Sequence, residues 1–243
     1  MSKKQNDMMG VIFNNVDNQY PYVDCDQSTF YLPFYKHEDE YFSSYENYIN
    51  FIKECEKLVR KHKYYKKHKK VLIEVVGMKT CQVLSNISTE DDPKEKITME
   101  MHHGPLLTLF DVCAIVLNSL MAKEDPFITT FRVANIVIEE HRLMRVRCVL
   151  LTKTVHQLVT EGKVILNYNM GVGDTAEFLK IYSDGLDNNL IHKINKYIKW
   201  SMENDSTDSE LLEVASVFRE WGCNDFDDFD EVLNYKKKSE NLT

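Results

Sequence analysis

The sequence predicts an α+β fold that is mainly helical, with helices packed around a small ββα element and a long two-helix insertion between its strands. Apolar residues recur at spacings of three and four along several segments, as they do in amphipathic helices. Shorter apolar or alternating segments are typical of strands, and one of them runs directly into a short helix. The chain has 243 residues, 43% of them hydrophobic, which is enough to bury a core.

The chain divides into three regions. They are an N-terminal arm and basic helix (1–76), a core with the helical insertion (77–168), and C-terminal helices with an acidic tail (169–243). Residues 1–39 show no clear period and predict an extended arm. Helical periodicity runs from about 40 to 69, and its basic end suits the negative end of a helix dipole.

The core region begins with two predicted strands, 81–87 and 97–103, joined as a loose hairpin by a polar loop that contains proline. Segment 71–76, before them, reads either as a short strand or as a last helical turn. Amphipathic helices are predicted over 107–123 and 129–143, and they form the insertion.

A half-buried strand is predicted over 145–151, and a helix over 152–162 follows it directly. Segment 163–168 is either a short strand or an extended exit from that helix. Helical periodicity returns over about 175–202, and one more amphipathic helix is expected at about 208–221.

Composition excludes several classes of protein. No apolar run approaches the roughly 20 residues that cross a bilayer. The N-terminus lacks the apolar stretch of a signal peptide. Six scattered cysteines without a CxxC pair indicate a reducing compartment. We therefore expect a cytoplasmic protein with no membrane partner.

Charge is polarised along the chain. The net charge of −8 counts against a general nucleic-acid binder, but residues 57–70 are densely basic and residues 203–231 strongly acidic. The basic block predicts phosphate contacts, with Tyr64 and Tyr65 available for base stacking; a merely solvated face is the alternative. The residues expected to contact nucleic acid are Arg60, Lys61, Lys63, Lys66, Lys67, Lys69, Lys70, Arg145 and Arg147.

Histidines stand at three informative points. His102 and His103 end a strand at a Gly-Pro break, and His156 lies on the first turns of the helix that follows the later strand. Glu100 shares a strand face with His102, because side chains alternate. Hydrolysis of a phosphodiester needs a divalent ion and a deprotonated water, and a neutral imidazole can take that proton. The pattern therefore favours metal-dependent phosphodiester chemistry.

The segments CQVLSNI, ITMEMHHGPL and RVRCVLLTKTVHQLVTEGK together resemble the HNH (ββα-metal) endonuclease family. The resemblance implies a DNA endonuclease or nickase in which His103 is the general base and His102 and His156 bind the metal. His141, in the insertion, is a further candidate ligand. The implied cofactor is Mg²⁺, Mn²⁺, Zn²⁺ or Ni²⁺, and a histidine-rich set suits a transition metal better.

The chain departs from that family pattern in ways that leave a second function open. Thr160 stands where relatives carry another helix histidine, and the middle asparagine has no counterpart. An inactive HNH-like module that binds nucleic acid, or a phage or host transcription, replication or virion protein, is the alternative. The sequence as a whole is similar to HNH-like proteins of AT-rich bacteriophages. For a phage-encoded protein, the location that this resemblance implies is the cytoplasm of the host cell. A hydrolase with Cys113 or Cys148 as nucleophile is disfavoured, because both lie in apolar runs.

Overall fold

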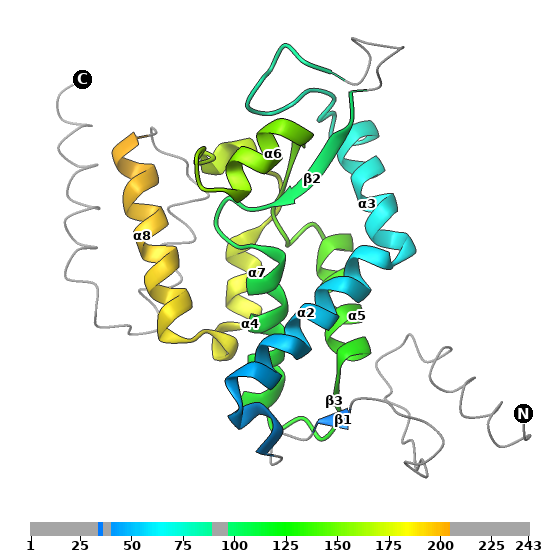
Figure 1. Cartoon of the computed structure of the whole chain (residues 1–243), viewed down its shortest axis with the longest axis vertical. Helices are drawn as coiled ribbons and strands as arrows, with labels where there is room; N and C mark the ends of the chain where they lie inside the picture. Colours follow the sequence, from blue (N-terminus) through cyan, green and yellow to red (C-terminus); the bar gives the residue numbers. More distant parts are fainter. Residues whose placement is uncertain (1–33, 36–39, 89–96, 205–243) are drawn as a thin grey trace, which may run out of the picture.

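The computed structural model describes residues 34–35, 40–88 and 97–204 (Figure 1). It confirms an α+β fold that is mainly helical, with small two-stranded sheets. Strand β1 (Phe34–Tyr35) pairs antiparallel with β3 (Ile128–Thr129). The remainder of the predicted arm, the polar loop of the predicted hairpin and the predicted helix at 208–221 lie wholly or mainly outside the described residues.

Two helices replace the single helix predicted over 40–69. After a 3₁₀ turn (Glu40–Ser43) come α2 (Tyr45–Lys61) and α3 (Lys63–Glu74). His62 separates them in an extended conformation, and its Nδ1 accepts a hydrogen bond from the backbone N–H of Tyr64 at 3.2 Å. The side chain of His62 therefore caps α3, and the last turn of that helix takes in residues 71–74 of the segment 71–76, which is not a strand.

The two-helix insertion is present as predicted. Helix α4 (Leu109–Ala122) begins with a capping box between Thr108 and Asp111, and its side chains are buried almost all round. Helix α5 (Thr130–Arg142) follows β3 and packs against α2, α3 and α4. Helix α4 thus lies at the centre of the main core, with α2 and α5 against it (Figure 1).

The prediction that 81–87 pairs with 97–103 is wrong. Strand β2 (Met99–His103) pairs antiparallel with β4 (Cys148–Thr152), so that His102 is opposite Val149 and His103 is opposite Cys148. Segment 81–87 is a loop beside β4, where the N–H of Gln82 donates to the carbonyl of Leu150 at 3.0 Å. The later strand competes better for β2 because its apolar residues contribute to both adjoining clusters.

Helix α6 (Lys153–Thr160) follows β4 without a linker, because the Thr152 hydroxyl caps its first turn. Val149, Leu151 and Val155 form a small apolar cluster between one face of the β2–β4 pair and α6. The opposite face, with Met101 and Leu150, adjoins the main helical core. A strand–strand–helix element is therefore formed, and its two faces have different environments.

The C-terminal part is more interrupted than the predicted helix over 175–202. Its helices are α7 (Thr175–Ile181) and α8 (Asn188–Asn204), with 3₁₀ turns at Tyr168–Met170 and Ser183–Gly185. Segment 163–168 contains no strand and leads into the first of these turns. Within the described ranges, no helix combines the length and the apolar character that crossing a bilayer requires.

Candidate functional site

The two adjacent histidines of β2 serve opposite faces of the sheet. Successive side chains on a strand point to opposite sides, and burial along β2 alternates accordingly. His102 is half-buried on the side of α6, whereas His103 is only 4% exposed and lies in the core. The doublet therefore contributes to two separate clusters of histidines.

The α6-face cluster consists of Glu100, His102 and His156. His156 Nδ1 donates to Glu100 Oε2 at 2.6 Å, which leaves Nε2 of His156 for another partner. The rings of His102 and His156 are 5.0 Å apart between centroids. Burial, helped by the charges of His156 and Arg60, lowers the pKa of His102 to about 4, so this imidazole is neutral at pH 7.

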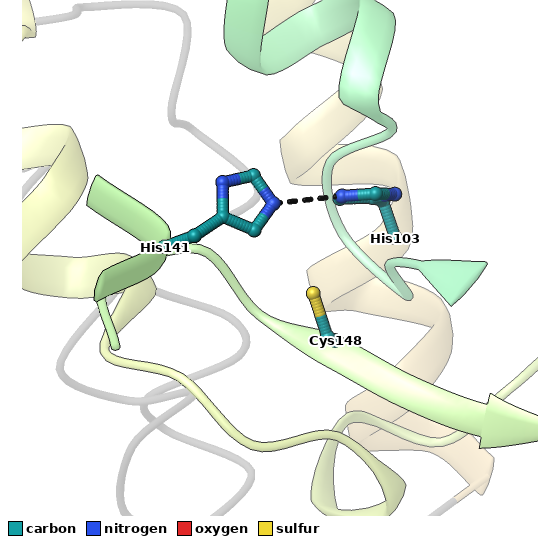
Figure 2. Close-up of side chains that lie close together, drawn as sticks. All are labelled: His103, His141 and Cys148. Atoms are coloured by element: carbon teal, nitrogen blue, oxygen red, sulfur yellow. Dashed lines mark hydrogen bonds between the residues drawn. The ribbon is translucent and has the colours of Figure 1, made fainter. Parts of the chain in front are cut away.

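The core cluster consists of His103, His141 and Cys148. Figure 2 shows a ring nitrogen of His141 directed at a ring nitrogen of His103, with the two rings nearly perpendicular and the thiol of Cys148 directed toward them. The Nε2 atoms of the two histidines are 2.9 Å apart, and one ligand atom from each of the three residues lies within 4.8 Å of the others. His141 Nδ1 donates to the Val137 carbonyl at 2.6 Å. Among the described residues, this is the only group of three metal-ligating side chains whose ligand atoms all lie that close to one another.

Burial controls the protonation of the core cluster. It lowers the pKa of His141 to about 4, and it lowers the pKa of His103 well below its ordinary value with help from the charge of His141. It also raises the pKa of the Cys148 thiol to about 12. Neutral imidazoles and a protonated thiol are therefore the forms at pH 7, and the imidazole form is the one that binds metals.

The structure brings some predicted site residues together and separates others. The predicted metal ligands His102 and His156 are neighbours, with Glu100 beside them as alternation implied. His141, expected as a third ligand, lies instead with His103 on the core face. His103, expected as the general base, is buried away from the α6-face cluster. A metal ion bound between His102 and His156 would therefore have neither His141 as a ligand nor His103 as a neighbouring base.

Two members of the core environment were not predicted as site residues. The sequence indicated that Cys148 is a core residue. Its position opposite His103 in the paired strands would have identified it as a site residue, but a single sequence does not give that register. His68 lies in the basic block, yet it is buried beside His141, with ring centroids 5.3 Å apart. The sequence signal that could have indicated its burial is the helical spacing of four residues between His68 and the buried Leu72.

The predicted nucleic-acid contacts also separate into groups. Six of the predicted contacts are exposed on α2 and α3: Arg60, Lys61, Lys63, Lys66, Lys67 and Lys70. Lys69 is half-buried and donates to the carbonyl of Met99 on β2. Arg145 pairs with Glu140 at 3.3 Å. Arg147 is 5% exposed, and its guanidinium donates to backbone carbonyls inside the protein rather than facing solvent.

Comparison with known proteins places the chain among proteins of the bacteriophage particle. The matching family model is described as "Bacteriophage G278-like virion protein" and covers residues 1–220. The chain belongs to this G278-like virion protein family. The match agrees with the expected phage origin, and it does not show membership of the HNH endonuclease family. No curated protein and no solved structure matches the chain.

Proposed function

We propose that this virion protein binds nucleic acid through the basic face of α2 and α3, which borders the ββα element. The observation that supports the proposal is that no acidic residue interrupts the sequence from Lys57 to Lys70, while most of its lysines are exposed. A virion protein of a phage shares its particle with a densely charged polymer, so an exposed cationic helix has an obvious polyanionic partner. Duplex DNA is the partner that we favour.

The arrangement of α3 suits a phosphate backbone. Lys63 and Lys67 flank the exposed ring of Tyr64, with each Nζ about 5 Å from the ring centroid. Lys66 and Lys70 are exposed one helical turn apart, so their charges lie on one side of the helix. Neutralising several phosphates releases counterions, and this release supplies most of the affinity of a sequence-independent contact.

The test is binding of the full chain to a fluorescent DNA duplex across a range of salt concentrations. The double charge reversal Lys66→Glu and Lys70→Glu should weaken binding and reduce the salt slope by about 1 for each lost phosphate contact. The matched control is Lys196→Glu with Lys199→Glu, which makes the same change in net charge on exposed positions of α8, away from the basic face. Equal losses of DNA affinity in the two variants would show that net charge alone causes the effect, and would contradict the proposal.

A second candidate function, metal-dependent cleavage of DNA, is favoured by the α6-face cluster. Glu100 holds His156 in the orientation that leaves Nε2 free, an arrangement common for metal-binding histidines. His102 is neutral and adjacent, so these two imidazoles are the ligands we assign to an ion that would activate water. The basic face of α3 lies on the neighbouring side of β2, because Lys69 reaches the carbonyl of Met99.

Nicking of supercoiled plasmid with Mg²⁺, Mn²⁺, Zn²⁺ or Ni²⁺ in turn tests this second candidate. Cleavage that His102→Ala and His156→Ala abolish, and that the exposed control His192→Ala leaves intact, supports it. Binding of DNA without nicking under any of the four ions rules it out and leaves the binding function alone. Including His103→Ala tests whether the buried histidine has the role of general base that the HNH resemblance implies.

A further inference from the structure

His68 has an unusual environment for a residue of a basic, solvent-facing helix. It is 6% exposed, and its Nε2 is a buried atom without a hydrogen-bond partner. Its ring meets the ring of His141 edge to face, at 5.3 Å between centroids. A buried polar nitrogen without a partner is costly, and a ligand bound at Nε2 would remove that cost.

We propose that His68, His103, His141 and Cys148 together bind one zinc ion in the interior of the protein. The four residues come from α3, from the end of β2, from the end of α5 and from the start of β4. Each therefore belongs to a different element, and the ion would fasten the β2–β4 pair to the helices α3 and α5. The site is separate from the basic face and from the α6-face cluster, so it does not depend on either proposed function.

The second coordination layer supports this assignment. The Val137 carbonyl accepts the proton on Nδ1 of His141 at 2.6 Å, which fixes the tautomer with a lone pair on Nε2. That lone pair faces Nε2 of His103 at 2.9 Å. In a tetrahedral zinc site with bonds of about 2.0–2.1 Å, two ligand nitrogens stand roughly 3.4 Å apart, so a small opening of the pair admits the ion.

A metal-free explanation accounts for only part of the cluster. If His103 carries its proton on Nε2, it donates to His141, and the pair is satisfied as a hydrogen bond. That bond leaves the buried Nε2 of His68 without a partner and assigns no role to the nearby thiol. An ion would resolve both points: Cys148 would supply a thiolate, and His68, whose ring centroid lies 5.3 Å from that of His141, would turn its ring to supply the fourth nitrogen.

The chemistry of the set points to zinc and to a structural role. Imidazole nitrogens and a thiolate are borderline-to-soft ligands, and four of them close a tetrahedral shell. His103, His141 and Cys148 are 4%, 2% and 0% exposed, so no position opens to solvent for a substrate. Binding replaces the S–H bond of Cys148 with a metal–sulfur bond and releases the proton to solvent, which makes affinity rise with pH.

Metal content and cobalt spectroscopy of the full chain test the proposal. Protein purified without chelator should contain about one zinc per chain by elemental mass spectrometry. After removal of metal, Co²⁺ should give the intense visible bands of tetrahedral coordination and a thiolate-to-cobalt charge-transfer band in the near ultraviolet. A wild-type chain with no bound metal and no such bands on titration would overturn the proposal, whatever the variants do.

Variants separate the four ligands. Cys148→Ser should lose the charge-transfer band, whereas Cys113→Ser, at another fully buried thiol, should keep it. His68→Ala should weaken cobalt binding by at least tenfold and alter the visible bands; unchanged affinity and spectrum would remove His68 from the set. Persistence of the thiolate band in Cys148→Ser would disprove this site. If Cys148→Ser does not fold, the band is assigned by elimination: Cys25, Cys55, Cys81, Cys113 and Cys223 are each replaced by serine singly, and the band must persist in all five variants. Loss of the band in any one of them would disprove the assignment to Cys148.

Discussion

Nε2 of His103 and Nε2 of His141 lie 2.9 Å apart in the interior, although 38 positions separate the two residues along the chain. The Val137 carbonyl accepts a hydrogen bond from Nδ1 of His141, so Nε2 of His141 carries a lone pair in the neutral ring. Both imidazoles are buried and neutral at pH 7. This contact joins the end of α5 to the end of β2, and acid should weaken it.

Stability of the metal-free protein should fall as pH decreases from about 6.5 to about 4. Burial lowers the pKa of His141 to about 4, against an ordinary value of 6.5, so the unfolded chain takes up the proton first. The stability associated with keeping His141 neutral is fully present above pH 6.5, and it is lost as the pH falls toward the pKa of His141 in the folded protein. The shift corresponds to roughly 3 kcal/mol. Urea unfolding at several pH values in the presence of chelator measures it.

The matched variant for this pH effect is His141→Leu, which removes the titrating group. Its unfolding free energy should depend less steeply on pH between 6.5 and 4 than that of the wild type, even if it is lower throughout. Equal slopes in the two proteins would show that burial of His141 does not control the acid sensitivity.

Arg147→Lys should destabilise the protein by roughly 2–4 kcal/mol. One guanidinium nitrogen, Nη1, donates to the Tyr168 carbonyl at 2.9 Å and to the Gly171 carbonyl at 2.7 Å, and Cζ lies 3.7 Å from the centre of the Tyr168 ring. Lysine keeps the charge but not the planar group that stacks on the ring. Urea unfolding gives the comparison, with the surface substitution Arg142→Lys expected to change little.

Gly185→Ala should cost more than about 2 kcal/mol, because a Cβ at this position would lie 2.0 Å from the Ile115 carbonyl oxygen of α4. The 3₁₀ turn and α4 would have to separate. Gly77→Ala is the control: its φ of +84° is strained for alanine, but no atom lies within 4 Å of the added Cβ, so we expect a cost of about 1 kcal/mol. Similar thermal shifts in both variants would contradict the close packing of α4.

Glu100→Ala should change the tautomer of His156. With Glu100 present, its carboxylate accepts the proton on Nδ1 of His156 at 2.6 Å, so neutral His156 should be the Nδ1–H form. Without that acceptor the Nε2–H form should gain population. Two-bond ¹H–¹⁵N correlation spectra distinguish the forms. Glu100→Gln retains an acceptor oxygen and should keep the Nδ1–H form; an identical spectrum for Glu100→Ala would exclude the contact.

The sequence alone determined the helical insertion, the individual strands β2 and β4 and the helix that follows β4, because these depend on local signals. Periodicity located α4 and α5, and Thr152 marked the start of α6. Local patterns did not determine strand pairing. The segment at 81–87 has a strand-like composition, and only the competition for β2 among distant segments decided that β4 is its partner.

The candidate sites divide in the same way. Strand alternation, a local property, placed Glu100 on the same face as His102, and the HNH resemblance grouped His102 with His156, which the β2–β4 pairing brings together. The tertiary structure decided that His103 turns inward to His141, and that Cys148 and His68 complete its surroundings. These four residues come from four elements, and their meeting depends on helix packing and strand register, which no short stretch of sequence encodes.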